Sequence, residues 1–115
     1  MSKEDFIRFQ AQTTPHPLAM EISYAEGTYI YDKNQNKYLD FVAGVSACSL
    51  GHRHPKVVNA IKKQLDSYMH VMVYGEYIQK AALELTQLLA QYLPPHVEKT
   101  YFTNSGTEAI DGALK

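Results

Sequence analysis

Ser105-Gly106-Thr107, near the C-terminal end of the sequence, has the residue types and spacing of a site for a phosphate group. Ser105 and Glu108 form the pattern of a capping box, in which each side chain accepts a hydrogen bond from a backbone N–H at the start of a helix. A helix N-terminus presents free N–H groups and a partial positive charge of roughly half a proton, which favours an anion. Gly106 allows a ligand to approach the backbone, and the hydroxyls of Ser105 and Thr107 can donate to phosphate oxygens. The alternative is an ordinary capped helix without a ligand.

Other kinds of site have little support. No Lys directly follows the turn, so neither G-x-x-x-x-G-K-[ST] nor G-x-G-x-x-G is present. His52 and His54 could in principle pair on a metal, but no Cys, Asp or Glu lies nearby in the sequence to complete a set of four ligands. We expect these histidines to make hydrogen bonds at a helix start instead, and we predict no metal site.

The elements around the phosphate turn follow from local patterns. Lys99–Thr103 is short and rich in β-branched and aromatic residues, which predicts a buried strand leading into the turn. Upstream, a small antiparallel meander is expected from Met20–Tyr24, Thr28–Tyr31 and Tyr38-Leu39, with the polar residues 32–37 as a turn. Helices are expected at Ser2–Gln12, after Pro55, and along the apolar stripe from Ile78 to Tyr92.

Two further stretches predict close contacts. Val42–Leu50 is rich in small residues, which indicates backbone that passes close to another chain or to a ligand. Tyr68–Gly75 is apolar without helical periodicity. We interpret it as a buried connector or a contact between subunits, because full exposure would leave an apolar patch.

The composition excludes several classes of function. The 115 residues include 11 basic and 12 acidic ones, and the net charge of −1 gives no electrostatic attraction to nucleic acid or to an anionic membrane. No run approaches the roughly 18 apolar residues of a membrane span, and the charged N-terminus does not fit a secretory signal. Cys48 is the only cysteine, which rules out an internal disulfide and fits a reducing compartment. The cytoplasm is the predicted location.

The end of the sequence does not have the features of a domain end. The helix that begins after Ser105 starts an apolar face, and the sequence stops without a C-cap. A single parallel strand at Lys99–Thr103 would also lack a partner. We expect the chain to be the N-terminal part of a longer protein.

In three places the sequence resembles the class III aminotransferases. Asn104-Ser-Gly-Thr-Glu-Ala109 resembles the phosphate-loop signature of that family. Gly27-Thr-Tyr-Ile-Tyr-Asp32 with Tyr38-Leu-Asp-Phe41 resembles its G-x-x-x-x-D … Y-[LI]-D-[FY] hairpin, and Gly51-His-Arg-His-Pro55 resembles its G-H-x-H-P turn. The resemblance covers most of the chain, with the motifs in the same order and spacing.

The resemblance implies an α/β fold, namely the N-terminal portion of a fold type I transferase that depends on pyridoxal 5′-phosphate (PLP). Residues 1–75 would contribute to the small domain and the dimer interface, and residues 76–115 would begin the large PLP-binding domain. Ser105, Gly106 and Thr107 would hold the cofactor phosphate. The lysine that binds PLP, the aspartate facing its pyridine nitrogen and the aromatic residue on its ring are implied to lie beyond Lys115. No catalytic residue is therefore predicted within this chain.

The implied reaction is transfer of an amino group from an amino acid or ω-amine to a 2-oxo acid such as 2-oxoglutarate, by a homodimer. Val45 matches the family position on the substrate side of the pocket, where ornithine δ-aminotransferases carry a tyrosine, and Pro15 stands where they carry another. Both differences favour an acetylornithine- or 4-aminobutyrate-type enzyme over an ornithine-type one. Glutamate-1-semialdehyde aminomutases share the signature at residues 104–109 and remain an alternative. Val45 could instead serve simple packing.

A different class of function also fits the residues alone, namely a small non-enzymatic α/β module that binds phosphate or another protein. Such a module predicts that the isolated chain unfolds cooperatively. An enzyme fragment predicts instead that the isolated chain is poorly folded, because its last helix and its strand edge lack partners.

Overall fold

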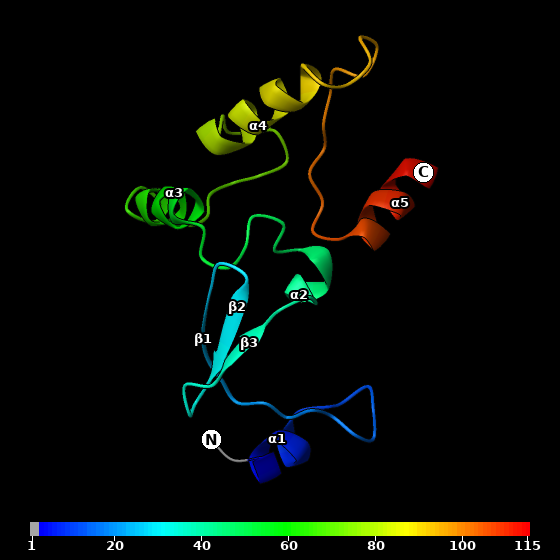
Figure 1. The fold of residues 1–115 in the computed structure, drawn as a ribbon. Helices are drawn as coiled ribbons and strands as arrows, with labels where there is room; N and C mark the ends of the chain where they lie inside the picture. The colour runs from blue at the N-terminus through cyan, green and yellow to red at the C-terminus, as the bar shows by residue number, and fades with distance from the viewer. Residues whose placement is uncertain (1–2) are drawn as a thin grey trace. The chain divides into compact units, whose positions relative to one another are not determined.

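The computed structural model describes residues 3–115, whose helices and strands are labelled in Figure 1. The chain divides into two compact units, of which the first ends at Met69 and the second comprises His70–Lys115. The first unit contains, in chain order, α1 (Lys3–Phe9), β1 (Ile22–Glu26), β2 (Tyr29–Asp32), β3 (Lys37–Leu39), α2 (Ala43–Ser46) and α3 (Pro55–Leu65). The second contains α4 (Lys80–Ala90) and α5 (Gly106–Leu114). The division into domains at residues 75 and 76 concerns a longer protein and stays a prediction.

The first unit is built on a 3-stranded antiparallel sheet in the order β1-β2-β3. Ala25 pairs with Ile30 across β1 and β2, and Ile30 pairs with Tyr38 across β2 and β3. The turn between β1 and β2 passes through Gly27, whose φ of 57° lies in the left-handed region that such a tight turn needs. The predicted meander is confirmed, with strand ends that differ from the expected ones by a residue or two.

Asp32 organises the turn between β2 and β3, and among residues 3–115 it is the only buried one, at 8% exposure. Its Oδ1 accepts the backbone N–H groups of Asn34 at 2.8 Å and Asn36 at 2.9 Å. Its Oδ2 accepts from the Asn36 amide at 2.9 Å and from the Tyr38 hydroxyl at 3.1 Å. These donors, the Asn36 amide first, favour the ionised carboxylate and lower the pKa of Asp32. The hydrogen bond to Asp32 likewise raises the pKa of Tyr38.

The helices follow the predicted apolar stripes in the middle of the chain. α3 starts with Pro55 in its first turn, and α4 covers the central part of the stripe from Ile78 to Tyr92. α1 is shorter than the predicted Ser2–Gln12, and Ser2 itself lies outside the described residues. No described helix between residues 3 and 115 combines the length and the apolar composition that crossing a membrane requires.

The strand predicted at Lys99–Thr103 is not formed, and that prediction was wrong for this chain. Nothing within residues 3–115 pairs with this segment in a β-ladder, since the described sheet consists of β1, β2 and β3. A strand depends on hydrogen bonds to a neighbour. Local composition therefore indicates a segment that can form a strand, but it does not indicate whether a second strand is present to pair with it.

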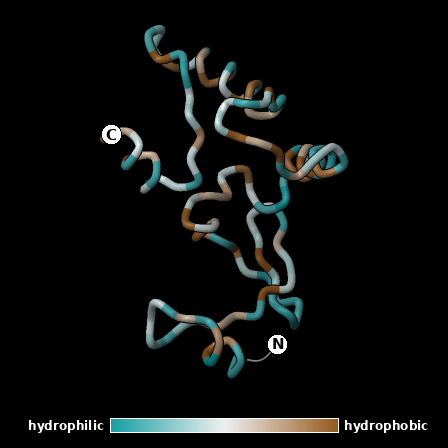
Figure 2. Tube along the Cα trace, turned by 180° about the vertical axis from the view of Figure 1, so that it is seen from behind, coloured by the Kyte–Doolittle hydropathy of each residue, from teal (hydrophilic) through white to brown (hydrophobic). Residues whose placement is uncertain are grey.

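No apolar side chain among residues 3–115 is buried. Apolar and polar residues alternate along α3 and α4 (Figure 2), and Ile61 and Leu88 on these helices are about half exposed. Within Tyr68–Gly75, predicted to be a buried connector, Met69 and Tyr74 are 84% and 78% exposed. The described residues thus do not cover this segment, and its alternative role in a subunit contact stays a prediction.

Candidate functional site

Helix α5 begins at the turn that was predicted to bind phosphate. Ser105 is its N-cap, with extended backbone at φ −150° and ψ 161°, and the Ser105 Oγ accepts the backbone N–H of Glu108 at 3.2 Å. The Glu108 carboxylate accepts the backbone N–H of Asn104 at 2.7 Å, whereas in a capping box it would accept that of the N-cap itself. The Ser105 half of the predicted capping box is confirmed, and the Glu108 half is displaced by one residue.

The first turn of α5 keeps donors available for an anion. Within residues 3–115, the N–H groups of Gly106 and Thr107 have no hydrogen-bond acceptor. Residues 105–107 are exposed, and a Cβ added to Gly106 would meet nothing within 4 Å, so a ligand can reach the backbone. The Ser105 hydroxyl retains its proton for donation because only its oxygen is used by Glu108. Two N–H groups and two hydroxyls at a helix N-terminus fit a phosphate group in charge and in donor type.

Val45 lies in the first unit, in the short element α2, whose backbone is a left-handed turn that the sequence did not predict. The φ angles of Ala43, Gly44, Val45 and Ser46 are 46°, 61°, 56° and 67°. This region costs about 1–2 kcal/mol for each residue other than glycine, and a β-branched residue there is an outlier. Val45 is also 87% exposed, so packing within the described residues does not compensate for the strain. Backbone strain of this kind is concentrated at functional sites.

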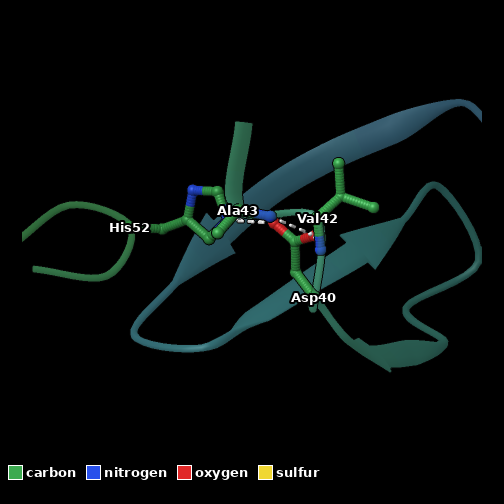
Figure 3. Close-up of polar contacts among 4 residues, drawn as sticks. All are labelled: Asp40, Val42, Ala43 and His52. Carbon is green, nitrogen blue, oxygen red and sulfur yellow. Dashed lines mark hydrogen bonds and ion pairs between the residues drawn. The ribbon is translucent and has the colours of Figure 1, made fainter. Parts of the chain in front are cut away.

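Asp40 holds the start of the turn, as Figure 3 shows. Its Oδ1 accepts the backbone N–H groups of Val42 and Ala43, both at 3.0 Å, and its Oδ2 lies 2.7 Å from Nε2 of His52. The hydrogen bond from His52, followed by that from Ala43, lowers the pKa of Asp40. The ionised carboxylate can only accept, which assigns the proton of this contact to His52 Nε2. The side chains of His52 and Asp40 are only 19% and 10% exposed, so little water competes for the contact.

The two histidines do not make the predicted hydrogen bonds at the start of a helix. His52 bonds Asp40 instead, because its backbone is paired with Gly27 through hydrogen bonds of 3.0 Å and 2.7 Å and is thereby held beside the sheet. His54 is the N-cap of α3 but makes no side-chain cap bond, and its buried Nδ1 has no partner within residues 3–115. The described residues contain no group of three or more His, Cys, Asp or Glu side chains that could hold a metal ion.

A comparison with known proteins identifies the family of this chain. Residues 9–115 match the family described as Aminotransferase class-III, and the chain belongs to that family. The acetylornithine aminotransferase of Clostridium acetobutylicum is 46% identical over 90 residues, which are 78% of this chain and 22% of that protein. A Bacillus subtilis protein named as a probable 4-aminobutyrate aminotransferase is 38% identical over 95 residues, which are 78% of this chain and 21% of that protein.

A solved structure agrees with these relatives. The crystal structure of acetylornithine aminotransferase from Elizabethkingia anophelis matches 97% of this chain and 28% of its own, with a TM-score of 0.81 and 31% sequence identity. The predicted fold class, the N-terminal portion of a PLP-dependent aminotransferase of α/β type, is confirmed. The chain spans about a fifth of the length of the curated relatives described above, at 22% and 21%.

The predicted site residues fall into both units. The start of α5 brings Ser105, Gly106 and Thr107 together in the second unit, whereas Val45 belongs to the first. Their roles toward a ligand stay predictions. Sequence reasoning missed Asp40, although an aspartate just before a turn commonly accepts N–H groups a few residues later. Its contact with His52, 12 residues away in the sequence, carries no local signal.

Proposed function

We propose that the protein carrying this chain uses PLP to transfer an amino group from an amino acid or ω-amine of the acetylornithine, 4-aminobutyrate or ornithine type to a 2-oxo acid such as 2-oxoglutarate. In this proposal Ser105, Gly106 and Thr107 hold the phosphate of the cofactor. The observation that carries it is the capped N-terminus of α5, where the N–H groups of Gly106 and Thr107 are free within the described residues. These donors lie in the stretch that resembles the phosphate loop of the family.

The turn binds and orients the phosphate through complementary donors. The N–H groups of Gly106 and Thr107 donate to phosphate oxygens, and the partial positive charge of the helix N-terminus adds to the attraction. The hydroxyls of Ser105 and Thr107 add two donors, of which the first is oriented by the hydrogen bond between Ser105 and Glu108. When bound, PLP supplies the electron sink for the substrate carbon that loses its proton.

No residue of this chain is assigned a catalytic role. Lys115 is the first lysine after the phosphate turn in the sequence. Its Nζ pairs with Asp111 at 2.6 Å, one helical turn earlier on α5. This contact supports a structural role for Lys115 and not a covalent link to the cofactor.

Among the substrates, an acetylornithine-type amine has the best support. Val45 and Pro15 replace the tyrosines that ornithine δ-aminotransferases carry at the matching positions, and two of the similar proteins are acetylornithine aminotransferases. A 4-aminobutyrate-type amine is second, supported by the Bacillus subtilis relative. A glutamate-1-semialdehyde aminomutase has the support of the shared signature alone.

The proposal extends to assembly and location. We propose a homodimer, since apolar residues such as Met69 and Tyr74 are exposed in the described chain and a second copy would cover such a surface. The cytoplasm is proposed because Cys48 has no disulfide partner within this chain. The alternative of an independent phosphate-binding module has less support, because a small domain needs a buried core and the described residues contain no buried apolar side chain.

The proposed phosphate site is tested by cofactor binding. The full gene product is stripped of cofactor and titrated with PLP, with the change in visible absorbance and in protein fluorescence as readouts. Replacement of Ser105 and Thr107 together by Ala is expected to weaken PLP binding by about a hundredfold, since a hydrogen bond to a charged group contributes roughly 1.5–3 kcal/mol. Thr86→Ala is the control, because Thr86 is a partly exposed helical threonine outside the phosphate turn, and its hydroxyl donates to the Leu83 carbonyl. Unchanged affinity in the double variant would reject the phosphate site.

A further inference from the structure

The left-handed turn Ala43–Ser46 is held by residues outside it. Inside the turn region, the backbone N–H of Ser46 donates to the Val42 carbonyl at 3.1 Å and that of Cys48 to the Ala43 carbonyl at 2.9 Å. These bonds close the turn but do not fix its direction relative to the sheet. That direction depends on Asp40, which accepts the two N–H groups with which the turn begins.

Asp40 is itself fixed on the hairpin between β1 and β2. Its backbone N–H donates to the Thr28 carbonyl at 2.9 Å, and its carboxylate accepts from His52. The backbone of His52 is in turn paired in both directions with Gly27, the neighbour of Thr28. The hairpin tip thus holds the carboxylate from two sides, through the backbone of Asp40 and through the ring of His52.

The side chain that this arrangement displays is Val45. It lies in the middle of the turn at a φ of 56°, and it is 87% exposed. Packing within the described residues does not hold this strained backbone, since no apolar side chain there is buried. The hydrogen bonds hold it instead, and they leave the Val45 side chain open to contact by a ligand.

We propose that Asp40, held in place by His52, is the positioning residue that fixes Val45 against the substrate and so takes part in the choice of amino donor. This inference rests on the proposed function, in which Val45 lines the substrate side of the pocket. Asp40 contacts neither substrate nor cofactor in this proposal, and it acts only through the backbone N–H groups of Val42 and Ala43.

The test is a double-mutant cycle in the full gene product with PLP bound. N-acetylornithine and 4-aminobutyrate are compared as donors, with 2-oxoglutarate as acceptor, and the selectivity is the ratio of their kcat/KM values. Asp40→Ala and Val45→Ala are each expected to change this ratio by about tenfold, chiefly through KM, because misplacement of a contact group has effects of this order or larger. Together they are expected to change it no more than either does alone, since Val45 is already misplaced without Asp40.

Asp32→Ala is the matched control. Asp32 also uses one carboxylate oxygen to accept two backbone N–H groups in the same unit, but it holds the turn between β2 and β3. We expect Asp32→Ala to lower the thermal stability while leaving the selectivity unchanged. Hydrogen exchange of residues 42–48 should rise in Asp40→Ala and stay as in the wild type in Asp32→Ala. Asp40→Asn should retain the wild-type selectivity, because its amide oxygen still accepts from Val42 and Ala43 and its NH2 group can donate to Nε2 of the other neutral tautomer of His52.

Two results would overturn the inference. One is a change in selectivity in the double variant that equals the product of the single changes, and the other is an Asp40→Ala protein that loses stability without any change in selectivity. If Asp40→Ala does not fold, His52→Ala replaces it in the cycle, because it removes one hydrogen bond to Asp40 and leaves those from Val42 and Ala43. If the wild-type protein transfers an amino group from none of N-acetylornithine, 4-aminobutyrate and ornithine, the proposed function itself is wrong.

Discussion

Gly51 and Gly27 approach each other so closely that a Cβ on Gly51 would lie 2.8 Å from the Gly27 carbonyl oxygen. The same pair of segments is joined by the two backbone hydrogen bonds between Gly27 and His52. The G-H-x-H-P turn therefore packs directly on the hairpin tip, and this contact brings the His52 ring to Asp40.

Gly51→Ala is expected to break this contact and to lower the free energy of unfolding by about 2–4 kcal/mol, from backbone strain together with the steric clash. Thermal unfolding of the full gene product measures the loss. Gly75→Ala is the control, because Gly75 has nearly the same φ, 77° against 80°, but a Cβ there would meet nothing within 4 Å. It should lose only the strain of about 1–2 kcal/mol. Equal losses in both variants would show that the close approach of Gly51 to Gly27 has no energetic weight.

Val45→Gly is expected to stabilise the protein by roughly 0.5–1 kcal/mol. It removes the penalty of a left-handed β-branched residue, and this gain exceeds the added chain entropy of glycine in the unfolded state. Val57→Gly in α3 makes the same chemical change at a helical position and should destabilise the protein. Thermal unfolding of both variants checks the opposite signs. A loss of stability in Val45→Gly would mean that the valine side chain is packed in the folded protein.

Ser105→Ala and Ser105→Thr separate the hydroxyl from the rest of the cap. Alanine removes the acceptor for the Glu108 N–H, which costs about 1 kcal/mol of helix stability, and it also removes a donor to the cofactor phosphate. Threonine retains both functions of the hydroxyl and should bind PLP nearly as the wild type does. Alanine should weaken PLP binding about tenfold, as measured by absorbance titration. If threonine weakened binding as much as alanine, the hydroxyl would not be the relevant group.

Asp32→Asn tests the turn between β2 and β3 through its pH dependence. The pKa of Asp32 is lowered in the folded protein, so the ionised carboxylate contributes stability above the unfolded-state pKa of about 3.9 and loses it as the pH falls through the folded-state pKa. Amide exchange of Asn34 and Asn36 should therefore be faster in Asp32→Asn than in the wild type near neutral pH, and the difference should shrink below about pH 4. The control is Glu98→Gln, at an exposed carboxylate that has no hydrogen bond or ion pair within residues 3–115. A difference that persists in acid would mean that the charge of Asp32 is not what holds the turn.

Much of the fold could be predicted because its signals are local. The meander follows from short β-branched and aromatic runs separated by Gly27 and by the polar residues around Asp32, and α3 and α4 follow from apolar stripes. The strand predicted at Lys99–Thr103 is absent, because a strand requires a partner and the described residues offer none. Local composition does not reveal whether such a partner is present.

The candidate site was predictable only in part. The cap at Ser105 is a pattern over four residues, and the structure confirms it. The left-handed turn around Val45 was not predictable, because alanine, valine and serine rarely adopt positive φ and nothing in their order signals it. Asp40 and His52 are in contact because the backbones of Gly27 and Gly51 lie close together. A contact between segments that are distant in the sequence produces no periodic pattern of residues, so it could not be predicted.

The hydrogen bonds that hold the turn at Val45 also make position 45 suitable for protein engineering. Its supporting hydrogen bonds come from backbone groups and from Asp40, and none of them involves the side chain at position 45. A saturation library at this single codon would therefore sample side chains on a common backbone. Glycine and asparagine would be its most readily accommodated members, because they tolerate the left-handed region best.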